Sequence, residues 1–580
     1  TVTGPSNWTA GTHTGTGTTQ FNGTLAISGA GTKSITGGRI VSAGNITTWS
    51  GNTANNNNTI SIASTSTFNN SGTFTESNVF ASTISGGTFN NSSTFNKTSA
   101  TTTTISTVFN NTGTVNVDAG TMLMQAGGTS TGTFAIDAGA KLEMRNGTHI
   151  LNNVTTSGDG TLEISTENVG ADALVTINGG TLGSAFLMSG SRMNGTDQVF
   201  TGPATWTGGN ITGLTTESTT FSGSLTISGA LTKTLTGGRD MNAGNTTWTG
   251  NTGNGNNAVG LSIGSVFTNT GTFTDSNAFD SSMSNGTFAN SGIFNKQSAT
   301  TTSMSSAFDN TGTVNVNAGT MLMNGGGTDS GVFNIADGAK LEFRNGAHTL
   351  NNVTTSGPGT FQISTENVGA DASVVLNGGT HTSVFLLSGS TLSGTDHTLQ
   401  GAATWTGGTI TGPATASTTF GSTLAITGLN TKTLSGGRDV NAGNTTWSGN
   451  TAAGNNAIAI ATGSAFNNTG TFTDSNAFDS AINAGNGGGI FNNGGTFNKQ
   501  SATTTAIGTA FNNTGTVNVQ AGTMLMNGGG VDSGQFNIAD GAKLEFRNGA
   551  HTLNNVTTSG LGTFQISTEN VGADATVTVN

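Results

Sequence analysis

The chain has 580 residues, of which 92 are Gly and none is Cys or Tyr, and its formal net charge is −12. Charged residues make up 8% of the chain, whereas an average globular domain has roughly 25%. A charge this low argues against charge-driven disorder, and the excess of Gly, Thr, Asn and Ser argues against a helical protein. The absence of Cys excludes a disulfide scaffold.

The acidic balance also argues against nucleic acid as a partner, because that role needs clustered Lys and Arg. No apolar run approaches the roughly 18 residues of a membrane span. The chain begins with Thr1 rather than Met, so we expect a processed chain or a window from a longer one.

A long repeat divides the chain into nearly three copies. Tryptophans recur at intervals of 198 or 199 residues, in two series: Trp8, Trp206 and Trp405, and Trp49, Trp248 and Trp447. We therefore expect repeat units at residues 1–198, 199–397 and 398–580, the third incomplete, in one continuous solenoid without linkers.

A shorter period of about 20 residues lies inside the long one. In the first copy, apolar residues form three series: Phe74, Phe95, Val115, Phe134, Val154 and Val175; Met122, Leu142, Leu162 and Leu182; and Phe68, Phe89 and Phe109, each of the last series followed by Asn-Asn. The same series recur in the second and third copies.

Each short segment alternates between apolar and polar residues. Leu142 and Met144 share one face, while Lys141, Glu143 and Arg145 share the other, which is the period of two of a half-buried strand. Gly-rich turns separate these strands. The pattern predicts an all-β protein, a right-handed parallel β-solenoid of about 20 residues per coil and about 29 coils, forming an elongated rod.

In such a solenoid, equivalent residues stack about 4.8 Å apart, so like residues form ladders. We expect Phe on Phe inside and Asn on Asn at the turns, with Asn side chains bonded along the axis. Like charges would repel at each step, which explains why charge is sparse. The third copy has four extra residues around 482–489, and we expect a loop to absorb them so that the ladder resumes at Phe491.

Two sets of repeated residues are candidates for metal binding. His149, His348 and His551 form a repeated set but lie about 10 coils apart, so they cannot share a metal, and we interpret them as turn histidines copied with the repeat. Glu167 and Asp172 recur as Glu366 and Asp371 and as Glu569 and Asp574. Two carboxylates, an Asn and carbonyls can hold Ca²⁺, but the spacing matches no EF-hand, so a solvated loop is preferred and no cofactor is predicted.

The remaining candidates concern catalysis and surface binding. The pairs Glu143 and Arg145, Glu342 and Arg344, and Glu545 and Arg547 are interpreted as surface ion pairs worth about 0–1 kcal/mol. The acidic residues are otherwise scattered, so we predict no catalytic residues and no enzyme. The six Trp suit packing better than sugar stacking. Thr-rich stretches at 101–104 and 298–303 suggest ice or crystal binding, but a regular Thr-x-Thr at every coil is not seen.

The run from Asn110 to Met124, Asn-Asn-Thr-Gly-Thr-Val-Asn-Val-Asp-Ala-Gly-Thr-Met-Leu-Met, and the run Phe-Asn-Ile-Ala-Asp-Gly-Ala-Lys-Leu-Glu-Phe ending at Phe343 resemble known repeats. They are similar to the right-handed β-helix repeats of bacterial filamentous-haemagglutinin-like adhesins and autotransporter passenger domains. The resemblance covers nearly the whole chain. It implies secretion and display at the cell surface as a stalk or fibre, which the absence of Cys fits.

We therefore expect an extracellular structural fibre or adhesin stalk whose partners are neighbouring copies of itself, end to end or laterally. The alternative is an adhesin that binds glycans or host surfaces through its lateral face, using Thr, Asn and Trp. A polysaccharide-degrading β-helix enzyme is the third hypothesis.

Overall fold

The computed structural model describes residues 1–166, 172–365, 371–568 and 574–580. These residues form strands, from β1 (Ser6–Trp8) to β71 (Thr576–Val579), and no helix. The strand pairs have parallel register, so the predicted all-β parallel solenoid is confirmed. Its right-handedness stays a prediction.

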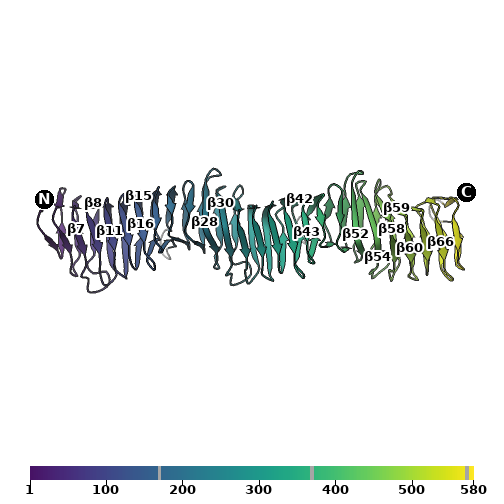
Figure 1. Ribbon diagram of the computed structural model, residues 1–580, viewed down its shortest axis with the longest axis horizontal. Coiled ribbons are helices and arrows are strands. Elements are labelled where there is room, and N and C mark those ends of the chain that lie inside the picture. Colours follow the sequence, from purple (N-terminus) through teal and green to yellow (C-terminus); the bar gives the residue numbers. More distant parts are fainter. Residues whose placement is uncertain (167–171, 366–370, 569–573) are drawn as a thin grey trace. The chain divides into compact units, whose positions relative to one another are not determined.

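The chain divides into two compact units, residues Thr1–Gly292 and Ile293–Asn580. Within each unit, successive strands lie side by side along the stack, as the labelled strands β7, β11 and β16 of the first unit illustrate (Figure 1). The boundary falls inside the second sequence copy, so the compact units and the sequence copies are different divisions of the chain.

Three aromatic or apolar columns form the core of the first unit. The column of Phe68, Phe89 and Phe109 has ring centroids 5.0 and 5.4 Å apart. Phe74 stacks on Phe95 at 5.0 Å and lies edge-on to Phe89. The first column lies on β8 (Ile60–Asn70), β10 (Ser82–Asn91) and β12 (Thr102–Asn111). The second lies on β9 (Thr73–Glu76), β11 (Thr94–Lys97), β13 (Thr114–Val117) and β16 (Thr133–Ile136). The third, an apolar column, lies on β14 (Thr121–Met124), β17 (Lys141–Met144), β20 (Thr161–Ile164) and β23 (Ala185–Met188).

The second unit repeats these columns. Phe466, Phe491 and Phe511 stack at 5.2 and 5.5 Å. They lie on β56 (Ala465–Asn468), β59 (Ile490–Asn493) and β62 (Ala510–Asn513). The extra residues of the third copy form the turn between β58 (Ser480–Ala484) and β59, and Phe491 returns to register with Phe466. The expectation that a loop absorbs the insertion is confirmed.

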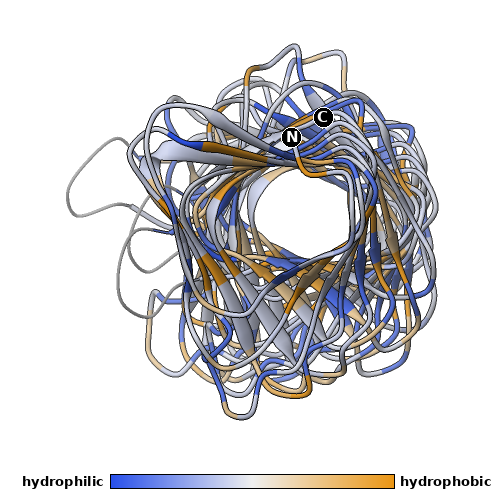
Figure 2. Cartoon of the chain, turned by 90° about the vertical axis from the view of Figure 1, so that its left-hand side faces the viewer, coloured by the Kyte–Doolittle hydropathy of each residue, from blue (hydrophilic) through white to orange (hydrophobic). Residues whose placement is uncertain are grey.

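The core lies between the strands that wind around the stack. Figure 2 looks onto the N-terminal end, where the ribbon surrounds a central space. Inward side chains fill that space, since Phe68, Phe74 and Phe89 are all fully buried. Burying each such side chain stabilises the fold by roughly 1.5–3 kcal/mol, and each coil obtains this gain only against its neighbours.

The length of a coil varies more than the sequence period suggests. One register step spans 18 residues, from Val175 to Met193, and another spans 27, from Lys33 to Ile60. The described residues therefore make about 26 coils of about 21 residues, and the predicted 29 coils are too many. Loops between strands take up the difference without breaking the ladder.

The variable coil length also corrects two of the predicted series. Phe134 faces Thr156 in the next coil rather than Val154, and Leu162 faces Phe186 rather than Leu182. Val175 instead faces His149, and Leu182 faces Thr156 in the preceding coil. The residues are buried as predicted, but a longer loop moves them into other columns.

Asparagine ladders run along the stack on both faces of the strands. Inside, Asn70 Nδ2 donates to Asn91 Oδ1 at 2.7 Å, and Asn91 Nδ2 donates to Asn111 Oδ1 at 2.8 Å. Outside, Asn90 Nδ2 donates to Asn69 Oδ1 at 2.9 Å. The predicted bonding of Asn along the axis is confirmed, and the inner ladder is fully buried.

Replacing Asn91 with Ala removes the middle of the inner ladder and leaves the amides of Asn70 and Asn111 without a partner at that position. We expect the free energy of unfolding to fall by about 1–3 kcal/mol, because a buried polar group that loses its partner keeps its desolvation cost. Urea unfolding measures the change. The matched control is Asn90→Ala on the outer ladder, where water replaces the lost bond and the expected loss is below about 1 kcal/mol. Equal losses in the two variants would contradict this account.

Candidate functional site

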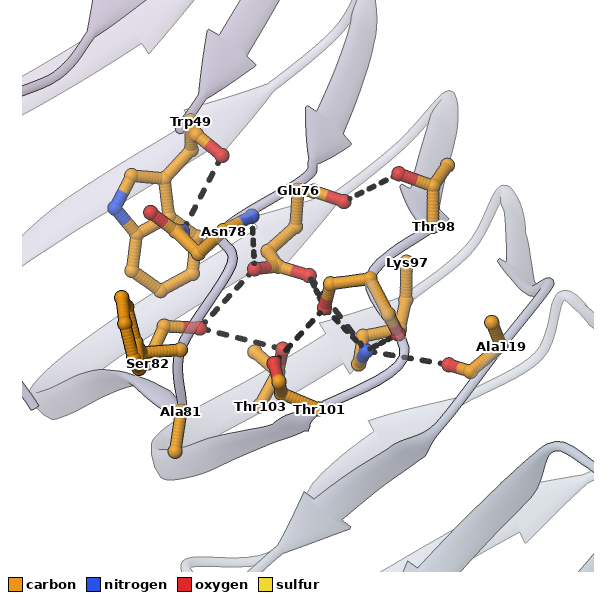
Figure 3. A network of polar contacts seen from close by, with 12 residues as sticks. Trp49, Glu76, Asn78, Ala81, Ser82, Lys97, Thr98, Thr101, Thr103 and Ala119 are labelled. Carbon is orange, nitrogen blue, oxygen red and sulfur yellow. Dashed lines mark hydrogen bonds and ion pairs between the residues drawn. The ribbon is translucent and has the colours of Figure 1, made fainter. Parts of the chain in front are cut away.

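A buried ion pair joins two successive coils of the first unit (Figure 3). Glu76 and Lys97 end β9 and β11, face each other in register and are fully buried. Lys97 Nζ lies 3.7 Å from Glu76 Oε2. Glu76 Oε1 accepts hydrogen bonds from the Asn78 backbone N–H at 2.9 Å and from Ser82 Oγ at 3.2 Å. Burial lowers the pKa of Lys97, and the charge of Glu76 opposes that shift.

In the second unit a shorter acid faces a lysine at the equivalent positions. Asp474 and Lys499 face each other in register on β57 (Thr471–Asp474) and β60 (Thr496–Lys499), and both are fully buried. Lys499 Nζ donates to Ser501 Oγ at 2.8 Å, and Asp474 Oδ2 accepts a hydrogen bond from Thr505 Oγ1. Sequence reasoning missed both pairs, although an acid and a Lys at equivalent positions of adjacent coils were the signal.

A second buried lysine recurs once in each copy: Lys33, Lys233 and Lys432. Lys233 Nζ donates to Leu231 O at 2.7 Å, to Gly229 O at 3.0 Å and to Asn257 Oδ1 at 2.6 Å. Trp248 Nε1 donates to the carbonyl of the same Asn at 2.9 Å. Burial lowers the pKa of each of these lysines to about 8. Full burial denies a substrate access to these lysines. Their hydrogen bonds instead fix the loop that precedes the next strand.

The tryptophans lie in the core, from Trp8 at 6% exposure to Trp49, Trp248 and Trp447 at 0%. The packing interpretation is confirmed, and the rings offer no platform for a sugar. The alternative of glycan binding through Trp is wrong on this point.

The repeated histidines are not in turns. His149 lies in β18 (Thr148–Asn152) and His348 in β42 (Ala347–Asn351), and both side chains point into the core and are buried. His551 lies in β68 (Ala550–Leu553). Each ring bonds through Nε2 to the carbonyl of the Asn three residues earlier, at 2.8 Å. The turn placement is wrong because His149 occupies the column position that Val175 takes one coil later.

Of the residues considered for calcium, Glu167, Glu366 and Glu569 lie outside the described residues. Asp172, Asp371 and Asp574 are described. Within the described ranges, no group of three or more acidic or histidine side chains is placed to hold a metal ion. The calcium alternative stays a prediction.

A column of threonines lies on the outer face of the first unit. The register places Thr73, Thr94, Thr114, Thr133, Thr155 and Thr181 on successive coils. Their sequence separations vary from 19 to 26 residues, which hides the column from a search at fixed spacing. In the second unit Val332 and Gln535 interrupt the equivalent columns.

Two of the Glu and Arg pairs, those of Glu143 and of Glu342, line a polar pocket on the lateral face. In the first unit Glu143 stacks on Glu163 of the next coil, between Leu123 and Leu187 in the same outward column. The predicted pairing of Glu143 with Arg145 is confirmed, at 2.7 Å, but Glu143 is only 3% exposed, so its carboxylate is covered rather than solvated. The carboxylate is covered because Lys141, Arg145 and the apolar neighbours of its column close over it.

The two stacked carboxylates are fully engaged. Lys141 Nζ bridges them, at 3.1 Å from Glu143 Oε2 and 2.8 Å from Glu163 Oε2. Ser165 Oγ and Arg145 Nη2 bond Glu143 Oε1, each at 2.7 Å, and Ser189 Oγ donates to Glu163 Oε1 at 2.7 Å. Burial raises the pKa of Glu143, but its hydrogen bonds from Ser165, Arg145 and Lys141 outweigh burial and lower it.

The pocket beside this cluster has a volume of about 540 Å³ in the first unit, and its counterpart in the second unit has about 510 Å³. Glu342 and Arg344 line the second pocket, with Gln362 at the position of Glu163 and Asn430 at that of Leu231. The pocket therefore recurs with different chemistry.

Comparison with known proteins returned no match to a family model, a curated protein or a solved structure. Among the described residues, no helix is long and apolar enough to cross a membrane.

Replacing Lys97 with Met leaves Glu76 as an uncompensated charge in the core. We expect the free energy of unfolding to fall by about 3–5 kcal/mol. The double variant Glu76→Gln with Lys97→Met removes both charges and should recover most of that loss. A urea-unfolding cycle of the two single variants and the double variant measures the coupling. Additive losses would show that the pair does not interact.

Acidification should destabilise the fold through its buried histidines. Burial lowers the folded-state pKa of His348 to about 4, and burial followed by the Arg438 charge lowers that of His397 to about 4, whereas an unfolded His titrates near 6.5. Between these values the unfolded chain binds more protons, so stability is present above about pH 6.5 and falls toward pH 4, by at most about 1.4 kcal/mol per pH unit for each His.

Urea unfolding at pH 7, 6, 5 and 4 measures this dependence. His348→Gln should flatten the slope between pH 6.5 and 4. An unchanged slope in this variant would contradict the assignment of the shifted pKa to His348.

Proposed function

We propose that the chain is part of an extracellular structural fibre or adhesin stalk, built from tandem copies of about 199 residues. The observation that supports this most is the register. Within each unit the described strands of successive coils pair in parallel register, so further copies extend the stack with contacts of the same kind.

Secretion and display at the cell surface are part of this proposal. The absence of Cys and the resemblance to adhesin and passenger repeats support it. Neighbouring copies are the proposed partners, because the last strand of a stack has unpaired edges that a further copy can cover.

We propose no catalytic role for the stacked carboxylates. Glu143 and Glu163 are both bound by the cation of Lys141, and serines bond their remaining oxygens. A general acid or base needs an oxygen within reach of a substrate. In this arrangement the carboxylates support the lateral surface.

A second function, glycan binding through the lateral face, is favoured by one observation. The pocket lined by Glu342, Arg344 and Gln362 is polar and has a volume of about 510 Å³, which lies in the range of small-ligand sites.

Electron microscopy of the source cells, with an antibody against this chain, tests the structural proposal. We expect label along filaments that leave the cell surface, and narrow elongated particles from the purified chain. Label confined to the cell interior, or compact round particles, would contradict the proposal.

A further inference from the structure

The lateral pocket has a different charge balance in the two units. In the first unit the cations Lys141 and Arg145 face two carboxylates, Glu143 and Glu163. In the second unit the equivalent cations, Lys340 and Arg344, face Glu342 alone, at 2.8 Å each. The difference arises because Gln362 replaces the second carboxylate in the next coil. The second pocket therefore carries one excess positive charge.

The second pocket also has unused hydrogen-bonding groups. Arg344 contacts Glu342 Oε1 through Nε at 3.0 Å and Nη2 at 2.8 Å, which leaves the Nη1 donors without a protein acceptor among the described residues. Gln362 Nε2 donates to Ser388 Oγ at 3.1 Å, and within the same residues its Oε1 has no protein donor. Arg145 in the first pocket contacts Glu143 through the same two nitrogens, Nε and Nη2, so the guanidinium is alike in both pockets. The difference lies in the next coil, where Ser189 and Lys141 occupy both oxygens of Glu163.

The walls of the second pocket are polar. Ser364, Thr365, Ser388 and Asn430 line it beside Arg344, and Leu231 stands in the first pocket where Asn430 stands in the second. A volume of about 510 Å³ lies within the roughly 300–1,000 Å³ range of small-ligand sites. Hydroxyl and amide groups suit the hydroxyls of a sugar, and a guanidinium suits a carboxylate.

We propose that the pocket at Arg344 and Gln362 binds a uronic-acid residue of an acidic polysaccharide. The guanidinium of Arg344 takes the carboxylate, and Gln362, Ser388 and Asn430 take the ring hydroxyls. Lys340 contributes the long-range attraction. The pocket at Arg145 is closed to the same ligand because Glu163 repels the carboxylate and Leu231 offers it no hydrogen bond. This site goes beyond the structural role proposed above, and it gives the lateral-face glycan hypothesis a place and a chemical class.

Calorimetric titration of the whole chain with trigalacturonate tests the proposal, with the fully methyl-esterified trisaccharide as the neutral probe. We expect the acidic sugar to bind and the ester to bind roughly 10- to 100-fold more weakly, because it lacks the charge that Arg344 bonds. Arg344→Ala and Gln362→Glu should each remove one binding site. The matched control Arg145→Ala makes the same truncation in the closed pocket and should leave binding unchanged.

The reciprocal variant adds a gain of function. Glu163→Gln combined with Leu231→Asn gives the first pocket the chemistry of the second, and it should add one uronate site. Equal binding of the methyl ester, equal loss from Arg145→Ala and Arg344→Ala, or no binding by the unmodified chain would each overturn the proposal. An oligoglutamate peptide that binds as tightly as the sugar would overturn the assignment to a saccharide. None of these outcomes affects the microscopy test of the structural role.

Discussion

The structure depends on one constraint: each residue faces the equivalent residue of the next coil, about 4.8 Å away. Residue types that attract their own kind can repeat without cost, as Phe89 does on Phe68 and Asn91 on Asn70. Like charges repel when they repeat in this way, whereas an acid and a base in adjacent coils attract, as Glu76 and Lys97 do. The one pair of stacked acids described above, Glu143 and Glu163, is held by a lysine that bridges both carboxylates. The low charge of the chain follows from this constraint.

The same constraint leaves the loops free. Register steps of 18 and 27 residues occur in one stack, because pairing fixes only the strands. The turn before Phe491 accommodates four more residues than its counterpart without disturbing the ladder. Buried groups such as Lys233 and Asn257 then fix a long loop to the core. Residue types that differ between the sequence copies are therefore found at the outward positions of the strands and in the loops.

The difference between Glu163 and Gln362 shows how a tandem repeat can separate two roles. Glu163 faces Glu143, and Gln362 faces the equivalent residue Glu342 in the second unit. With Glu, the cluster satisfies its own charges and stabilises the surface. With Gln, a cation and an amide are left for a ligand. A single substitution on an outward position changes the charge of the pocket while the inward columns stay the same, since alternate residues of a strand point to opposite faces.

Alternation and an approximate 20-residue period are local patterns, so the all-β parallel stack, the Phe and Asn ladders and the burial of the tryptophans could be predicted from the amino-acid order alone. It did not determine which residues share a column beyond Phe134, where Thr156 replaces the expected Val154. The core position of His149, the buried pair of Glu76 and Lys97, and the burial of Glu143 were likewise decided by the tertiary structure. Each depends on which residue faces it from the adjacent coil. Loops of unequal length set how many residues separate two such positions in the sequence, so a fixed period does not identify them.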